Sequence, residues 1–204
     1  MGKQDSLRQY REKRDFHKTG EPTGEGTASS GEPIFVIQKH AASRLHYDFR
    51  LEVDGVLASW AVPKGPSTDP EDRRLAVPTE DHPLDYVDFE GVIPEGSYGA
   101  GTVLVWDTGT YRNLRAEDPA HPMSMEKSLR DGKVLIWLEG KKLRGGYALV
   151  RTNMGGTKNW LLIKERDLQA DARRDPVSTA PNSILSGRSL EEIAQQAAGK
   201  EDFS

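Results

Sequence analysis

The sequence contains no cysteine among its 204 residues, which excludes disulfide bonds and thiolate metal ligands. Any bound metal ion must therefore be held by imidazole or carboxylate groups. No run of apolar residues is long enough to cross a membrane, and the N-terminus is charged rather than built as a secretory signal. We therefore expect a soluble, cytoplasmic protein.

Hydrophobic residues are also scarce: they make up 35% of the chain, and the mean hydropathy is −0.68. These values are low for a chain packed throughout, so part of the length is expected to be solvated tail or loop. The formal net charge of −4 shows that the protein is not coated with positive charge. A local basic site would still suffice to hold one nucleic-acid end.

Composition divides the chain into three expected parts. Residues 1–33 are expected to form a flexible N-terminal arm, because a basic stretch is followed by Gly, Thr, Ser, Glu and Pro, which bury little. A packed domain is expected over residues 34–165. A C-terminal strap with a short helix or linker is expected over residues 166–204, where Ser189 and Glu192 form a capping-box pattern.

The central part predicts a mainly β fold. Short apolar or alternating runs, many rich in Val, Ile, Trp and Tyr, are separated by glycine-containing turns. Asp54-Gly55 between two such runs predicts a tight hairpin, because both residues tolerate positive φ. Helix patterns are few, with one at residues 123–130. We expect a compact antiparallel β-barrel with short peripheral helices. The runs are residues 34–38, 45–53, 56–62, 102–106, 133–138, 147–152 and 160–164.

Polar chemistry is concentrated in residues 46–50, HYDFR. Alternate side chains of a strand share a face, so His46, Asp48 and Arg50 are expected to project together, with the apolar residues between them on the opposite face. Polar residues facing the interior of a small barrel are costly unless they bind something. A metal ion or an anion is the expected ligand. The alternative is a solvent-exposed face with an Asp48–Arg50 ion pair.

Two more histidines lie close in sequence. His40 precedes this strand, where a loop can fold its imidazole toward the same face, and His82 stands in a turn before Pro83. Two histidines with one carboxylate suit Mn²⁺, Zn²⁺, Fe²⁺ or Co²⁺ and leave coordination positions open. Alternatively, each histidine is an ordinary surface or capping residue. Glu80 or Asp81 could orient an imidazole, or these residues simply cap the turn.

Cations accompany these residues and favour phosphate chemistry. Guanidinium groups bind phosphate oxygens bidentately, whereas a redox oxygenase has no need of several cations. The alternative for Arg73 and Arg74 is a solvated loop pair. The flanking cations are Arg50, Lys64, Arg73 and Arg74.

These residues lie in segments that together resemble the 3'-phosphoesterase domain of the bacterial DNA ligase D family. The resemblance covers roughly residues 10–165 and lacks the polymerase and ligase regions, so we expect an excised N-terminal module or a stand-alone member. The segments are residues 36–40, 44–52, 54–57, 59–66, 74–77, 80–84, 89–94, 96–101, 106–107 and 160–164.

The resemblance implies an Mn²⁺-favouring enzyme, with Co²⁺ or Zn²⁺ as other candidate ions. It would remove a 3'-terminal ribonucleoside from a DNA primer–template and then hydrolyse the remaining 3'-phosphate to a 3'-hydroxyl. The implied setting is non-homologous end joining at the nucleoid, alongside Ku and the ligase and polymerase modules. We expect a monomer.

The resemblance also implies roles for individual residues. It implies metal ligation by His40, His46 and Asp48, and phosphate contacts by Arg50, His82 and Tyr86. Supporting substrate-binding positions would be Gln38, Lys64, Arg74 and Glu80, and N-terminal catalytic residues would be Arg14, Asp15 and Glu21. A protonated His82 could bind the phosphate or protonate the departing oxygen. Tyr86 and Tyr98 could each contact sugar or base, but Tyr98 is interpreted as packing. Residues 96–101 are interpreted as turns rather than a phosphate loop.

Two other functions stay open. His46 and Asp48 with a distant His82 or His121 imitate the facial triad of a non-haem Fe(II) oxygenase on a cupin-like barrel. A non-catalytic module that binds DNA ends is the second alternative. Ferrous-dependent oxygen consumption would favour the oxygenase, and strong end binding without turnover would favour the binding module.

Overall fold

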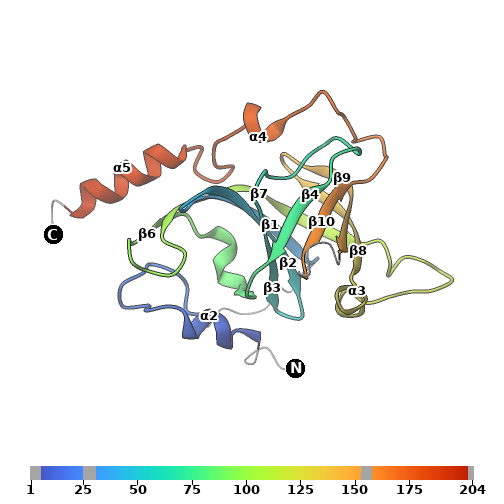
Figure 1. Cartoon of the computed structure of the whole chain (residues 1–204), viewed down its shortest axis with the longest axis horizontal. Helices are drawn as coiled ribbons and strands as arrows, with labels where there is room; N and C mark the ends of the chain where they lie inside the picture. The colour runs from blue at the N-terminus through green and yellow to red at the C-terminus, as the bar shows by residue number, and fades with distance from the viewer. Residues whose placement is uncertain (1–5, 25–30, 153–157, 202–204) are drawn as a thin grey trace.

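The computed structural model describes residues 6–24, 31–152 and 158–201 and contains a closed antiparallel β-barrel (Figure 1). The eighth strand of the path pairs back with the first, which closes the sheet. This confirms the predicted mainly β fold. The barrel strands, in spatial order, are β1 (Ile34–Ala41), β2 (Leu45–Val53), β3 (Val56–Val62), β4 (Arg74–Pro78), β10 (Trp160–Lys164), β9 (Arg144–Arg151), β8 (Lys133–Gly140) and β7 (Gly101–Asn113).

Two short strands and five short helices are attached to this barrel in the described part of the chain. β5 (His82–Pro83) pairs with β3, and β6 (Gly91–Ile93) pairs with β7. None of the described helices is long and apolar enough to span a membrane. The helices are α2 (Arg8–Glu12), the 3₁₀ helix η1 (Leu84–Asp88), α3 (Met125–Asp131), α4 (Pro176–Thr179) and α5 (Leu190–Glu201).

The backbone conformation agrees with two local patterns in the sequence, a hairpin turn and a helix capping box. Asp54 and Gly55 take φ values of 50° and 82° in the β2–β3 hairpin, as a primed turn requires. At the start of α5 the amide of Glu192 donates to Ser189 Oγ, while the amide of Ser189 donates to the Glu192 carboxylate. This is the reciprocal capping box predicted from these two residues.

The barrel interior is apolar. Side chains from all eight barrel strands form one buried cluster that includes Tyr47, Phe49 and Leu51 of β2. A second buried cluster lies outside the barrel, where Val36, Leu57 and Val105 meet residues of α2 and η1. The polar face of β2 therefore points outward. The expectation that these polar residues face the barrel interior was wrong, because the larger apolar residues between them fill that space.

The N-terminal segment differs from the expected flexible arm over the residues that the structure describes. Leu7 and Tyr10 are fully buried, and the Tyr10 hydroxyl donates to the Pro22 carbonyl at 2.7 Å. Figure 1 shows this segment along one side of the barrel, beside the chain that contains η1. A few apolar residues anchor it, and average composition does not reveal them. The rest of the expected arm, residues 1–5 and 25–30, lies outside the described residues.

Candidate metal and phosphate site

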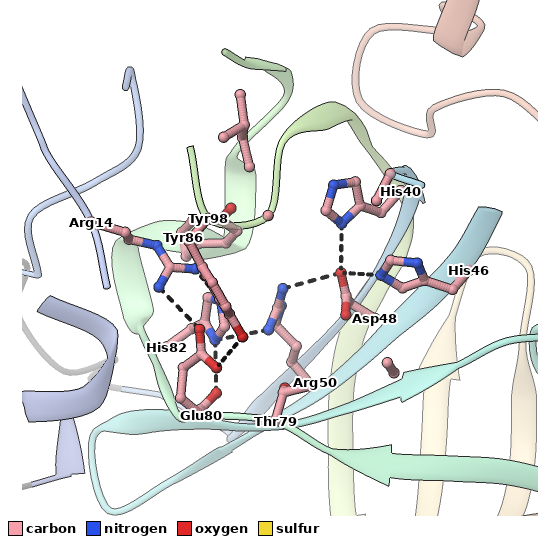
Figure 2. A pocket seen from close by; sticks show the side chains of 14 residues that line it. Arg14, His40, His46, Asp48, Arg50, Thr79, Glu80, His82, Tyr86 and Tyr98 are labelled. Carbon is pink, nitrogen blue, oxygen red and sulfur yellow. Dashed lines mark hydrogen bonds and ion pairs between the residues drawn. The ribbon is translucent and has the colours of Figure 1, made fainter. Parts of the chain in front are cut away.

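A cavity of about 280 Å³ lies on the outer face of β2. Its floor is the sheet, and its walls come from the N-terminal segment, the chain around η1 and the loop between β6 and β7. Figure 2 shows an imidazole–carboxylate cluster at one end, Arg50 in the middle and an acid–guanidinium group at the other end. In that order the principal lining residues are His40, His46, Asp48, Arg50, His82, Glu80, Arg14 and Tyr98.

The imidazole–carboxylate cluster joins β1 and β2. His40 lies within β1 rather than in a loop, and it pairs directly with His46 across the two strands. His40 Nδ1 and His46 Nε2 lie 3.4 and 3.6 Å from Asp48 Oδ2. One ligand atom from each residue lies within 4.8 Å of the other two. The three side chains predicted to share an ion are therefore brought together.

The arrangement of donor atoms suits a divalent cation, although in the protein alone burial is outweighed by Asp48, which raises the pKa of His46 above its ordinary value. His46 Nδ1 donates to the Arg44 carbonyl at 3.0 Å, which leaves the lone pair of a neutral imidazole on Nε2, facing Asp48. Burial opposes ionisation of Asp48, but Arg50 and the two imidazoles outweigh it and hold the pKa of Asp48 well below its ordinary value. Two imidazole nitrogens and one ionised carboxylate form a donor set that fits Mn²⁺, Zn²⁺ or Co²⁺.

Arg50 is a buried cation held in a fixed position. Its Nε donates to Gln38 Oε1 at 2.8 Å, and its Nη1 donates to Ser59 Oγ at 2.9 Å. Gln38 is oriented in turn, because its amide nitrogen donates to the carbonyls of Tyr86 and Phe89. Arg50 Nη2 lies 3.4 Å from Asp48 Oδ2. The guanidinium is thus directed at the space beside the cation site.

His82 lies between two guanidinium groups. Arg50 Nη1 is 2.9 Å from His82 Nδ1, and Arg14 Nη2 is 3.3 Å from His82 Nε2. Burial, followed by the charges of Arg50 and Arg14, lowers the pKa of His82 well below its ordinary value. A neutral ring that donates from Nδ1 to the Glu80 carbonyl can accept from Arg14 at Nε2. This environment disfavours the protonated role considered for His82 from the sequence.

Arg14 and Glu21 bring the N-terminal segment into the site. Arg14 donates to Glu21 Oε1 at 2.9 Å and to Glu80 Oε1 at 3.0 Å, and its side chain is 3% exposed. Tyr86 also donates to Glu21 Oε1, at 2.9 Å. Burial raises the pKa of Glu80, but hydrogen bonds from its own backbone, Lys13 and Arg14 bring it below the ordinary value. The network joins the segment to the cavity wall.

Three residues expected in the site lie elsewhere. Asp15 is half exposed and pairs with Lys18 at 3.4 Å. Arg74 pairs with Asp72 at 2.6 Å, and Lys64 is exposed. None of the three lines the cavity. Their roles toward substrate stay predictions.

Tyr98 lines the cavity, although the sequence was interpreted as placing it in packing. It is 48% exposed, and its hydroxyl lies 3.3 Å from Glu80 Oε2 and 3.2 Å from Lys13 Nζ. Gly96 and Gly99 on either side have φ values of 80° and 75°, which confirms the turns predicted there. In the sequence, the position of this aromatic residue between two glycines was the signal that could have indicated a place at the cavity.

Comparison with known proteins shows that the chain is similar to DNA end-joining proteins. A family model described as the DNA Ligase D 3'-phosphoesterase domain matches residues 38–151. The Multifunctional non-homologous end joining protein LigD of Pseudomonas aeruginosa is 50% identical over 189 residues, which is 90% of this chain and 22% of that protein.

Mycobacterial relatives give a similar result. The Multifunctional non-homologous end joining DNA repair protein LigD of Mycobacterium tuberculosis is 49% identical over 150 residues, 73% of this chain and 19% of that protein. The Mycolicibacterium smegmatis protein named Multifunctional non-homologous end joining protein LigD is 43% identical over 195 residues, 95% and 24% respectively. The chain thus spans less than a quarter of each of these relatives. The stretch matched by the family model includes the imidazole–carboxylate cluster and Arg50, whereas Arg14 and Glu21 precede it.

Proposed function

The chain belongs to the family of DNA ligase D 3'-phosphoesterase domains, and we propose that it hydrolyses phosphate esters at DNA 3' ends with the help of Mn²⁺. The proposed reactions are removal of a 3'-terminal ribonucleoside, leaving a 3'-phosphate, and hydrolysis of that phosphate to a 3'-hydroxyl. The observation that carries the proposal is the convergence of His40, His46 and Asp48 beside Arg50 in one cavity.

A divalent cation would be held by His40, His46 and Asp48. When bound, it would polarise a phosphoryl oxygen and lower the pKa of a coordinated water. Imidazole and carboxylate donors suit Mn²⁺ as well as Zn²⁺ and Co²⁺, so the choice of Mn²⁺ rests on the family resemblance.

The charge distribution favours a phosphate at Arg50. Arg14 and Lys13 face two carboxylates, Glu21 and Glu80, so their charges are offset. Within the described residues, the carboxylate of Asp48 is the one that pairs with Arg50, and it would be shared with the cation. A bound cation and Arg50 together give this end of the cavity a net positive charge, which suits an anionic ester.

In the proposed mechanism, Arg50 stabilises the additional charge on the phosphoryl oxygens as phosphorus becomes five-coordinate. Its position is fixed before substrate arrives, because Gln38 and Ser59 accept two of its N–H groups. Tyr86 lies beneath the guanidinium, with 5.2 Å between Arg50 Cζ and the ring centroid. His82 is proposed to position Arg14, from which its Nε2 can accept a hydrogen bond, rather than to donate a proton to the substrate.

The substrates and partners proposed here follow the family. We propose a DNA primer–template end as substrate, action as a monomer in the cytoplasm at the nucleoid, and cooperation with Ku and with ligase and polymerase modules. The relatives' names, which contain non-homologous end joining, support this setting.

The oxygenase alternative has weaker support. The distant histidines considered for it are poorly placed, because His82 lies between two arginines and His121 is exposed. Among the described residues, the candidate metal cluster contains neither of them. The donor set of His40, His46 and Asp48 would also suit Fe²⁺, so the buried Arg50 beside it and the family match are what favour the phosphoesterase.

The test uses a 5'-labelled primer–template that ends in a 3'-phosphate or a 3' ribonucleotide, incubated with Mn²⁺, Co²⁺, Zn²⁺ or no metal. We expect metal-dependent conversion of both ends to a 3'-hydroxyl. The variant His46→Ala should lose this activity, whereas His121→Ala, which changes an exposed histidine outside the cavity, should retain it. Tight end binding without any product would support the binding module instead, and Fe²⁺-dependent oxygen uptake would support the oxygenase.

A further inference from the structure

Tyr98 differs from every other large hydrophobic side chain exposed in the described part of the chain. The others are leucines, and Tyr98 alone among them is aromatic. It also lines the cavity that contains Arg50. Burial of aromatic rings stabilises a fold, so a half-exposed ring at a cavity rim has no evident role in the core.

The loop between β6 and β7 holds this ring at the rim. The amide of Ser97 donates to the Pro94 carbonyl, and the amide of Ala100 donates to the Ser97 carbonyl, both at 3.1 Å. The left-handed φ values of Gly96 and Gly99 allow these two successive turns. Tyr98 therefore lies between two tight turns instead of in a strand or a helix.

The side chain is also fixed. Its hydroxyl contacts Glu80 and Lys13, and Lys13 Nζ lies 4.5 Å from the ring centroid. Figure 2 shows Tyr98 beside Glu80, across the cavity from the imidazole–carboxylate cluster. A ring that is already ordered loses little conformational entropy when a ligand packs against it.

The other tyrosine of the cavity cannot serve the same purpose. Tyr86 is 2% exposed, and its ring contacts His82, Phe89 and the Arg50 guanidinium. Its surface is thus occupied by protein groups. Lys13 Nζ and Arg14 Cζ also lie 4.5 and 5.5 Å from the centroid of the Tyr98 ring, but Tyr98 keeps about half of its surface exposed, where a ligand can pack.

We propose that Tyr98 is a positioning residue that stacks on the terminal base of a DNA 3' end while the phosphate of that end lies at Arg50. The inference rests on the proposed function, which supplies the nucleotide. Arg50 and the half-exposed Tyr98 line the same cavity, so a nucleotide whose phosphate is held at Arg50 and that leaves the cavity on the side of Tyr98 would meet this ring. Aromatic side chains accept every base in this way, because each base has a π-face, and the Lys13 ammonium beside the ring suits the charged backbone.

The test compares two primer–templates that carry a 3'-phosphate, one with an intact terminal nucleotide and one whose terminal nucleotide lacks its base. With the wild-type protein, loss of the base should raise KM about tenfold and leave kcat unchanged, as removal of one stacking contact predicts. Tyr98→Ala should raise KM by the same factor on the intact end and cause no further change on the abasic end. Tyr98→Phe and Tyr98→Trp keep an aromatic ring but lose the hydroxyl contacts with Glu80 and Lys13, so each should raise KM on the intact end less than Tyr98→Ala does.

Leu168→Ala serves as a matched control, because Leu168 is fully exposed and lies outside the cavity lining. It should match wild type on both ends. A loss in Tyr98→Ala that is equal on both ends, or that falls on kcat, would indicate a structural role and overturn the inference. Wild-type turnover that ignores the terminal base would overturn it while leaving the proposed function intact. Absence of wild-type turnover on either end would overturn both.

Discussion

Replacement of Arg50 tests the proposed chemistry most directly. Arg50→Ala removes the guanidinium placed to stabilise developing charge on phosphorus. Loss of one preorganised charge-stabilising donor typically costs about 2.7–4 kcal/mol in the transition state, so kcat should fall by about 10²–10³. Arg50→Lys retains the charge but loses the planar fork held by Gln38 and Ser59. We expect it to recover only part of the lost rate.

The same substitution should leave the protein folded. Arg50→Ala leaves Gln38 Oε1 without its donor and removes the charge that pairs with Asp48, whereas Ser59 Oγ still donates to the Leu57 carbonyl. A buried group without a partner costs about 1–3 kcal/mol. Because Arg50 itself lines the cavity, the space it vacates is open to water, so the cost should stay near the lower end of that range for each group. A typical domain is stable by about 5–15 kcal/mol. Circular dichroism should therefore match wild type, with a modestly lower Tm.

The assay is single-turnover hydrolysis of a 3'-phosphate primer with saturating Mn²⁺, accompanied by thermal unfolding of each variant. Retention of more than a tenth of the wild-type rate by Arg50→Ala would refute the assignment of charge stabilisation to this residue. Loss of rate together with loss of the folded circular dichroism spectrum would show that Arg50 acts on the fold instead. Arg112→Ala is a suitable control, because Arg112 is exposed and pairs with Glu117 at 2.8 Å.

Two further predictions concern the fold around the site. Tyr10→Ala should destabilise the protein by about 3–5 kcal/mol, as loss of a buried aromatic ring predicts. Limited proteolysis of this variant should cut the N-terminal segment faster than the barrel. Cleavage of the segment at the wild-type rate would contradict the packing of Tyr10. Hydrogen bonds from Lys164 and Gly146, acting against desolvation, hold the pKa of Asp167 below its ordinary value of 3.8. Its contribution to stability is therefore complete above about pH 4 and is lost as pH falls through the lower, folded-state pKa. The difference in urea midpoint between wild type and Asp167→Asn should be present at pH 7 and shrink below pH 4, and a difference that is constant with pH would rule out this linkage.

Local rules accounted for the features that depend on neighbours in sequence. The alternation of His46, Asp48 and Arg50 along a strand followed from the period of two, and the Asp54-Gly55 turn followed from φ preferences. These features need no knowledge of distant contacts, and the structure confirms them. The family resemblance supplied the grouping of His40 with His46 and Asp48, which the geometry brings together.

Features that depend on distant contacts could not be derived in this way. Alternation shows that two faces differ, but which face lies inside depends on the volume that the closed barrel must fill. Whether the N-terminal segment packs depends on Tyr10 finding a surface formed by residues of β1, β3 and β7. The same holds for Tyr98, since only the folded loop places its ring beside Glu80.

Because the site lies on the outer face of the barrel, the cavity is formed by two separate parts of the chain, the barrel domain and the N-terminal segment. The barrel closes through strands that begin at Ile34, whereas one wall is supplied by residues that precede the barrel. A shortened protein that starts at the first barrel strand would retain the cation ligands and Arg50 on an intact scaffold. It would also leave Val36, Leu57 and Val105 without the cover of Tyr10, and Glu80 without its two cationic partners. Such a fragment should bind metal ions normally, aggregate more readily, and hold a nucleic-acid end in an open trough instead of an enclosed pocket.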